Sequence, residues 1–85
     1  MVRNLTCNHL RMSKKKSALN VRFGKRLETL RKGQDWTFVY LAEHSGLDDK
    51  FLRDLEHGEK EPCLNTLDVL AKSFDMSMSE LLKGI

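Results

Sequence analysis

The stretch LAEHSGLDDKFLRDLEHG, residues 41–58, has the pattern of two short helices joined at a glycine. After the glycine, apolar residues recur at helical spacing and include Phe51 and Leu55. Gly46 suits the left-handed conformation that ends a helix, where a side chain would cost roughly 1 to 2 kcal/mol. Asp48 is placed to cap the helix that follows. The stretch therefore predicts two helices that cross at a tight turn.

Helical periodicity continues on the N-terminal side of this stretch. A helix of about residues 19–33 is predicted, ended by Gly33, because apolar residues recur there at i, i+4 and i+7. The first helix of the pair covers about residues 37–45, with Thr37 as its N-cap. Ala42 is the small residue expected where the paired helices cross. The apolar stripe of the first predicted helix consists of Phe23, Leu27 and Leu30.

Two more helices are predicted after Pro62, which interrupts the chain. The first covers about residues 64–74 and the second about residues 78–83. Ser77 and Glu80 form a capping box at the start of the last helix. The buried side of the helix at residues 64–74 is predicted to hold Leu64, Leu67, Leu70, Ala71 and Phe74. Five short helices with brief connections indicate an all-α domain.

The charge of the chain is unevenly distributed. The 85 residues carry a net charge of +3, yet residues 1–18 hold five Lys or Arg and no acid. Residues 19–85 hold ten Lys or Arg against twelve Asp or Glu, a balance of −2. Residues 1–18 lack sustained periodicity, so we expect a disordered basic tail before a single folded domain at residues 19–85. Net charge by itself does not indicate that the folded part binds nucleic acid.

Several classes of protein are disfavoured by the sequence. It holds no Gly-rich phosphate loop, no nucleophile elbow and no paired carboxylates on a buried face, so we expect no enzyme. Cys7 and Cys63 lie far apart without CxxC spacing, so neither a metal site nor a disulfide is expected. No apolar run approaches a membrane span or a signal peptide. We expect a cytoplasmic, nucleoid-associated protein without cofactor, membrane contact or small-molecule ligand.

Four segments in order resemble a known family. They are FGKRLETLR at 23–31, LAEHSGL at 41–47, FLRDLEHGEKEP at 51–62 and TLDVLAKSFDMSMSELL at 66–82. Each segment is weak evidence, but all four at this spacing resemble the lambda-repressor-like, or XRE-type, helix-turn-helix family of DNA-binding domains. The resemblance implies a compact five-helix fold. It also implies a sequence-specific transcriptional regulator, a stand-alone repressor or controller protein that binds double-stranded DNA as a homodimer on a pseudo-palindromic operator.

The family's third helix lies in the major groove, and the resemblance places four side chains of this chain there. Lys50 and Arg53 can donate to guanine or phosphate, and an aspartate can accept from cytosine N4. The alternative is the solvated face of an amphipathic helix, with Lys50 and Asp54 as an i, i+4 charge pair. The predicted base-reading residues are Asp49, Lys50, Arg53 and Asp54.

Contacts to the DNA backbone are expected at two helix N-termini, whose amides carry a partial positive charge. Thr37 and Phe38 begin the second helix. The remaining candidates are side chains: Lys60, Asn65 and Thr66 around the fourth helix, and Lys14, Lys15 and Lys16 of the tail. For Lys60 the alternative is a solvated loop lysine, and for the tail it is a solubilising segment.

One position departs from the family pattern. Where the family commonly has glutamine, at the first residue of the second helix, this chain has Phe38. Val39, Tyr40 and the preceding Trp36 make this helix start unusually apolar. Two explanations are open: the patch packs against the N-terminal segment or a partner chain, or the backbone contact is remodelled. An adaptor- or antitoxin-like protein-interaction module that kept the fold without reading DNA is therefore the alternative function.

The resemblance also implies a structural ion pair, and the apolar residues near the C-terminus suggest a dimer interface. Arg31 and Glu56 occupy positions that form an ion pair in the family, so we expect a partly buried pair; the alternative is an ordinary surface pair worth about 0 to 1 kcal/mol. The last helix has more apolar residues than it needs for its own packing. We expect the dimer interface at Met78, Leu82 and Ile85.

Overall fold

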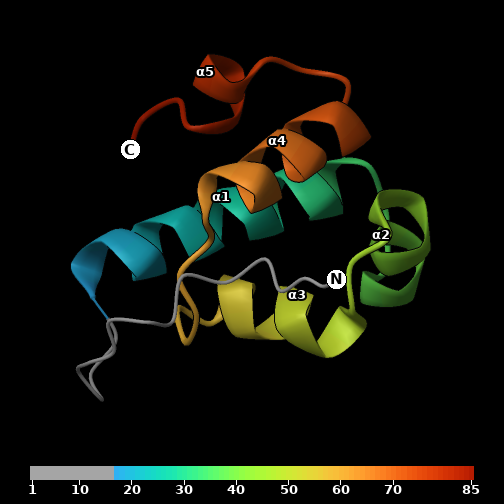
Figure 1. Ribbon diagram of the computed structural model, residues 1–85, viewed down its shortest axis with the longest axis horizontal. Helices are drawn as coiled ribbons and strands as arrows, with labels where there is room; N and C mark the ends of the chain where they lie inside the picture. The colour runs from blue at the N-terminus through green and yellow to red at the C-terminus, as the bar shows by residue number, and fades with distance from the viewer. Residues whose placement is uncertain (1–16) are drawn as a thin grey trace.

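The computed structural model describes residues 17–85, which form five helices (Figure 1). In this view α1 crosses the middle of the molecule, with α3 below it, α4 above it and α5 at the top (Figure 1). At one end, α2 packs against both α3 and α4. The helices are α1 (Ala18–Gly33), α2 (Phe38–Ser45), α3 (Asp49–Glu56), α4 (Leu64–Ser73) and α5 (Met78–Leu81). The predicted all-α fold is confirmed, with the last helix shorter than expected.

Side-chain caps start the helices where the sequence predicts them. Thr37, Asp48 and Ser77 each accept a hydrogen bond from a first-turn amide, in α2, α3 and α5 respectively. The described residues supply one of the two bonds of the predicted capping box, from the Glu80 amide to Ser77 Oγ at 3.1 Å. Ser17 caps α1. The end of the predicted tail, residues 17–18, thus belongs to the folded domain, while residues 1–16 lie outside the described part.

The predicted end of α1 at Gly33 is confirmed, but Gly33 is not the left-handed residue that was expected there. Gly33 is still helical, and the left-handed residue is Asp35, with a φ of 60°. Backbone amides after Gly33 satisfy the last carbonyls: Asp35 N–H donates to Lys32 at 2.9 Å, and Trp36 N–H donates to Arg31 at 3.1 Å. The left-handed residue that turns the chain is therefore Asp35, two residues after Gly33. Aspartate is one of the few residue types other than glycine that tolerate the left-handed conformation.

Buried leucines from every helix form one core. The fully buried side chains are Leu27, Leu41, Leu52, Leu55, Leu70, Leu81 and Thr66. The prediction that Leu64 is buried is wrong, because its side chain is 72% exposed. Thr66 lies one helical turn before Leu70 and takes the inward position at the start of α4, while Leu64, the first helical residue, faces solvent.

A glycine that the sequence analysis did not single out sets the approach of α1 to α3. A Cβ placed on Gly24 would lie 2.5 Å from the backbone carbonyl oxygens of Leu55 and Glu56. Gly24 is buried, so there is no room for a side chain between the two backbones. The position of the C-terminal end of α3 therefore depends on a glycine at this crossing.

Two arginines of α1 hold the C-terminal segment. Arg26 Nη2 donates to the Glu80 carbonyl at 2.7 Å, and its Nε donates to the Leu81 carbonyl at 3.1 Å. Arg22 Nη2 donates to the Ile85 carbonyl at 2.8 Å. Arg26 thus supplies a donor to the Leu81 carbonyl at the end of α5, where intrahelical donors run out, and both arginines tie α1 to the C-terminal segment. These contacts were not predicted from the sequence.

Candidate nucleic-acid interface

The turn between α2 and α3 has the predicted geometry. Gly46 ends α2 with a φ of 82°, and its amide donates to the Ala42 carbonyl at 2.8 Å. Leu47 is buried below the turn, and Asp48 Oδ2 then accepts from the Lys50 amide at 3.1 Å. Because Leu52 points into the core, the opposite side of α3 faces outward. The turn and the core thus fix which face of α3 is available to a partner.

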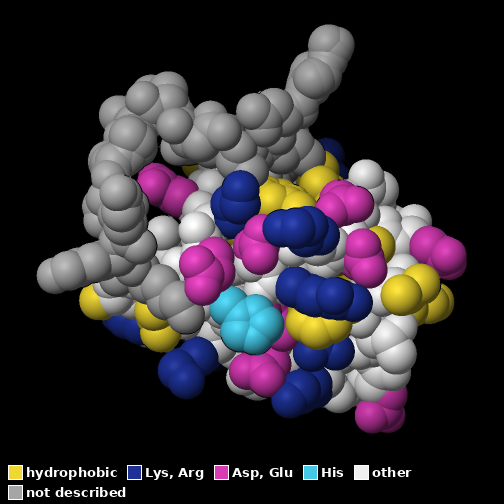
Figure 2. Space-filling model, turned by 90° about the horizontal axis from the view of Figure 1, so that it is seen from below, with side chains coloured by type: hydrophobic (Ala, Val, Ile, Leu, Met, Phe, Trp, Pro, Cys, Tyr) yellow, Lys and Arg dark blue, Asp and Glu magenta, His cyan; other side chains and the backbone are white. Residues whose placement is uncertain are grey.

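The outward side of α3 carries both signs of charge. The exposed fraction of the side chain is 79% for Lys50 and 55% for Arg53, but 41% for Asp49 and 23% for Asp54. Seen from the α3 side, Lys and Arg side chains alternate with Asp and Glu side chains (Figure 2). The described residues therefore present no uniformly basic surface at α3.

The four predicted base-reading residues pair with one another. Lys50 Nζ lies 3.5 Å from Asp54 Oδ2, and Arg53 Nη2 lies 3.6 Å from Asp49 Oδ2. Both pairs have i, i+4 spacing, which is the arrangement expected of a solvated helix face. Exposed pairs are worth about 0 to 1 kcal/mol, so another acceptor can replace either carboxylate at little cost. The geometry of these pairs is therefore compatible both with a base-reading surface and with a solvated helix face.

The predicted ion pair between Arg31 and Glu56 is present and buried. Arg31 Nε lies 2.6 Å from Glu56 Oε2, and Arg31 Nη2 donates to Glu56 Oε1 at 3.2 Å. The exposed fractions of the two side chains are 10% and 5%. The remaining nitrogen, Nη1, donates to the Trp36 carbonyl at 2.8 Å. This pair joins α1 to α3 and to the segment before α2, so the alternative of an ordinary surface pair does not apply.

Phe38 packs against two arginines of the same chain. The Cζ atom of Arg31 lies 4.1 Å from the centroid of the Phe38 ring, and the Cζ atom of Arg53 lies 5.5 Å from it. Both distances fall within the range of a cation–π contact. The apolar start of α2 is therefore partly covered from within the domain. Val39 and Tyr40 remain 54% and 47% exposed.

Trp36 anchors the start of α2 through aromatic contacts. Its ring stacks on Phe74 with the centroids 5.2 Å apart and the planes 15° apart. Tyr40 and His44, one and two turns along the same side, have their centroids 5.0 and 5.2 Å from that of Trp36. The stacking on Phe74 ties the start of α2 to the end of α4. The contact of His44 with Trp36 was not predicted, although the spacing of four residues between Tyr40 and His44 was visible in the sequence.

The residues predicted to contact the DNA backbone differ in their exposure. Lys60 and Asn65 are exposed near the start of α4, and the prediction of a side-chain contact from Thr66 is wrong, because Thr66 is fully buried. Thr37 Oγ1 already accepts from the Tyr40 amide at 3.0 Å. At the start of α4, Cys63 makes no side-chain cap hydrogen bond. Lys14, Lys15 and Lys16 lie outside the described residues.

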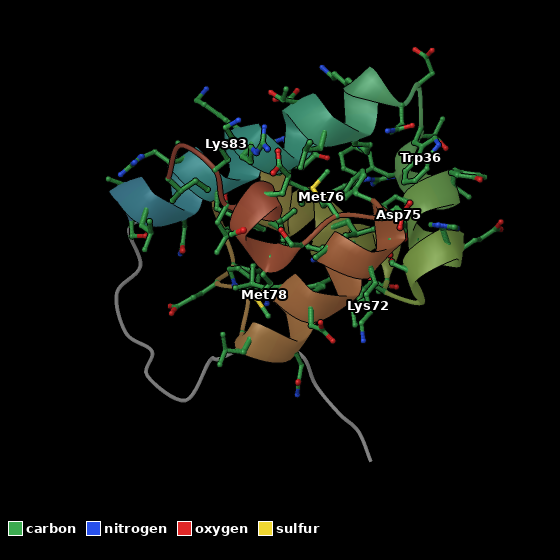
Figure 3. The ribbon with its side chains drawn as sticks, turned by 90° about the horizontal axis from the view of Figure 1, so that it is seen from above. Trp36, Lys72, Asp75, Met76, Met78 and Lys83 are labelled. Carbon is green, nitrogen blue, oxygen red and sulfur yellow. The ribbon has the colours of Figure 1, made fainter. Side chains whose placement is uncertain are left out.

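The residues predicted for the dimer interface lie together at the C-terminal end. Met78, Leu82 and Ile85 are each half-buried against the core. Seen from above, Met76 lies near the middle of the molecule, Met78 lies on the α4 side of α5, and Lys83 lies beside α1 (Figure 3). α5 therefore has one side on the core and one that is partly accessible.

The described residues hold one further surface feature, an open groove at the turn. Its volume is about 440 Å³, and it is lined by Val39, Ala42, Glu43, Gly46, Leu47, Asp48 and Asp49. Within residues 17–85, no three His, Cys, Asp or Glu side chains gather closely enough to hold a metal ion. None of the described helices is both long and apolar enough to cross a membrane.

Known proteins share this arrangement. The solved structure of the restriction-modification controller protein C.AhdI from Aeromonas hydrophila superposes with a TM-score of 0.74 at 34% sequence identity, covering 76% of this chain and 98% of the controller protein. No family model matches the chain. The five-helix arrangement, the capped turn and this coverage show that the chain belongs to the lambda-repressor-like helix-turn-helix family.

Two curated proteins are similar over the same part of the chain. The HTH-type transcriptional regulator AnsR of Bacillus subtilis is 37% identical over 57 residues, and the immunity repressor protein of Bacillus phage phi105 is 32% identical over 59 residues. These matches cover 67% and 69% of this chain but 49% and 41% of the relatives, so the chain spans less than half the length of either. The relatives are regulators, in agreement with the expectation that this chain is not an enzyme.

Proposed function

We propose that this chain is a sequence-specific DNA-binding transcriptional regulator that presents α3 to the major groove of double-stranded DNA. The observation that carries the proposal is the outward face of α3, where Lys50 and Arg53 are the most exposed charged side chains of the four candidates. Family membership supports it, since the helix after the turn is the recognition helix in helix-turn-helix domains.

Within this proposal, Lys50 and Arg53 donate to guanine O6 and N7, and Asp49 and Asp54 accept from cytosine N4. The first-turn amides of α2 and α4 contact phosphates, as helix N-termini commonly do. Lys60, Asn65 and the basic residues 14–16 add side-chain contacts to the backbone. Since the exposed pairs of α3 are weak, exchanging a carboxylate for a base or phosphate costs little.

Two copies of the chain bind together in this proposal. Met78, Leu82 and Ile85 form the interface, because their side chains are only partly covered by the domain itself. A two-fold dimer places its recognition helices about 34 Å apart, one turn of the duplex, on a pseudo-palindromic operator. Because its proposed ligand is chromosomal DNA, the protein is expected in the cytoplasm, associated with the nucleoid.

Selection of binding sites from random duplex DNA at physiological salt tests the proposal. We expect enrichment of a two-fold symmetric sequence whose half-sites lie about one helical turn apart. A chain that enriches no sequence above the starting pool would contradict the function. Enrichment of a single asymmetric half-site would contradict the dimer while leaving DNA reading intact.

A protein-interaction module is the second candidate, favoured by the pairing of both cations of α3 with acids of the same helix. The dependence on salt separates the two. Binding to phosphates releases counterions, so affinity falls by roughly a thousandfold or more between about 50 and 200 mM salt when several phosphates are neutralised. Docking on a protein through the exposed Val39 and Tyr40 side chains would show little dependence on salt.

A further inference from the structure

The ring of Phe38 links the buried ion pair to the exposed side of the recognition helix. Arg31 is 8% exposed, and all three nitrogens of its guanidinium group donate hydrogen bonds within the domain. That group lies 4.1 Å from the centroid of the Phe38 ring, so the ring rests on a fixed neighbour. Phe38 itself is half-buried against the core. The ring is thus held at a defined place beside α3.

Arg53 reaches the same ring from the other helix of the pair. Its Cζ atom lies 5.5 Å from the ring centroid, and its Nη2 atom lies 3.6 Å from Asp49 Oδ2. An arginine that is 55% exposed would otherwise sample many rotamers. Two contacts, one aromatic and one ionic, therefore restrict where the guanidinium group of Arg53 lies on the outside of α3.

The two contacts respond differently to DNA. The carboxylate of Asp49 competes with a base or phosphate for the N–H donors of Arg53. A cation–π contact uses the positive charge above the ring and does not consume the donors, which lie in the plane of the guanidinium group. Arg53 can therefore exchange Asp49 for guanine O6 and N7 while Phe38 still restricts its position.

We propose that Phe38 is a positioning residue that aims Arg53 at one base pair and thereby sets the sequence preference of the domain. This inference rests on the proposed function, because it assigns the position that Arg53 reads. It also explains why an aromatic residue at the apolar start of α2 does not need an external partner. The ring orients a base-reading side chain without touching DNA.

The first part of the test uses the protein without DNA. Phe38→Leu keeps an apolar side chain and removes the ring, while Phe38→Tyr keeps the ring. We expect the ring-current shift of the Arg53 Nε–H resonance to disappear in Phe38→Leu and to persist in Phe38→Tyr. Melting curves of both variants serve to check that each is folded. An unchanged Arg53 resonance in Phe38→Leu overturns the contact, and the inference with it.

The second part measures sequence preference by site selection with wild type, Phe38→Leu, Phe38→Tyr and Arg53→Met. We expect Arg53→Met to lose about 5- to 150-fold discrimination at one base pair of the half-site. Phe38→Leu should lose discrimination at that same base pair, and Phe38→Tyr should restore it. Loss at a different base pair, or uniform weakening over all sequences, overturns the positioning role.

The outcomes also separate this inference from the proposed function. If wild type enriches a site that depends on Arg53 but not on Phe38, the positioning role alone is overturned. If wild type enriches no site, the proposed function fails and the positioning role fails with it, even where the ring-current shift is present.

Discussion

The third helix carries two kinds of ion pair that differ in their surroundings. On its inner side, Glu56 binds Arg31 with side chains that are 5% and 10% exposed. On its outer side, Lys50 pairs with Asp54 at 3.5 Å, with side chains that are 79% and 23% exposed. The inner pair spans two helices and is bidentate, whereas the outer pair lies within one helix.

The surroundings decide what each pair does. A buried charge that loses its partner has no water to replace it, so the inner pair constrains the fold strongly. Water and salt replace the partner of an exposed charge easily, so the outer pairs constrain the fold weakly. The same property leaves the outer charges available to DNA. The eight-residue helix α3 thus carries a structural ion pair on its inner face and exchangeable charges on its outer face.

The largest expected effect is on the inner pair. Glu56→Ala strands the Arg31 guanidinium group and should lower the free energy of unfolding by roughly 3 to 5 kcal/mol. Asp54→Ala, the matched change on the outer side, should cost about 0 to 1 kcal/mol. Denaturant titrations of the two variants measure the contrast.

Two further variants sharpen this result. Glu56→Gln retains hydrogen-bond acceptance and should lose less stability than Glu56→Ala. The double variant with Arg31→Met and Glu56→Leu removes both charges and should recover part of the loss, since a buried pair is often replaceable by apolar residues. Equal stabilities for Glu56→Ala and Asp54→Ala would show that burial makes no difference here.

The second-largest loss of stability is expected from a substitution at the crossing of α1 and α3. Gly24→Ala places a Cβ 2.5 Å from the carbonyl oxygens of Leu55 and Glu56, so α1 must move away from the C-terminal end of α3. We expect a loss of roughly 1 to 3 kcal/mol, typical of overpacking. Gly33→Ala is the control, because its Cβ meets nothing within 4 Å. A thermal melt in which both variants equal wild type would contradict the close crossing.

The outer side should affect binding and leave stability nearly unchanged. Lys50→Ala and Arg53→Ala should each change the free energy of unfolding by no more than about 0.5 kcal/mol, as expected for surface positions. Each should lose roughly 1 to 3 kcal/mol of discrimination at one base position in competition binding. Uniform weakening across all sequences would instead assign the residue to a phosphate contact.

The smallest effect is expected for an exposed pair on α1, where a hydrogen bond from Lys32 and its charge lower the pKa of Glu28. Because the pKa is lowered in the folded state, the small stabilisation is present above the pKa of the unfolded chain. It is lost as the pH falls through the folded pKa. Lys32→Met should raise the Glu28 pKa in an NMR titration, and an unchanged pKa would contradict the pair.

Local signals in the sequence were sufficient for the five helices and for the caps of α2, α3 and α5, but not for the Ser17 cap of α1. The caps at Thr37 and Asp48 and the left-handed Gly46 were predicted because each depends on a few neighbouring residues. The end of α1 at Gly33 was predicted correctly, but its left-handed residue was not, since Gly33 is helical and Asp35 adopts that conformation. The local sequence was compatible with a left-handed glycine or a left-handed aspartate. The packing of Trp36 on Phe74 joins segments that are far apart in the sequence, so no local pattern indicates it.

The candidate site was predicted less completely. The family resemblance supplied the Arg31–Glu56 pair and the outward residues of α3, while their mutual pairing was one of two interpretations that the sequence left open. Thr66 was placed at the surface although it is fully buried. Periodicity gives the spacing of a helix face, but the direction in which that face turns depends on neighbouring helices.

The sequence by itself determined the five helices, the capped starts of α2, α3 and α5, and the charged composition of α3, because periodicity and capping act over one or two turns. Only the tertiary structure decided that Gly24 brings α1 against the end of α3, and that Phe38 lies beside both Arg31 and Arg53. These contacts join residues from separate helices. Their presence depends on how the core packs, which no local pattern specifies.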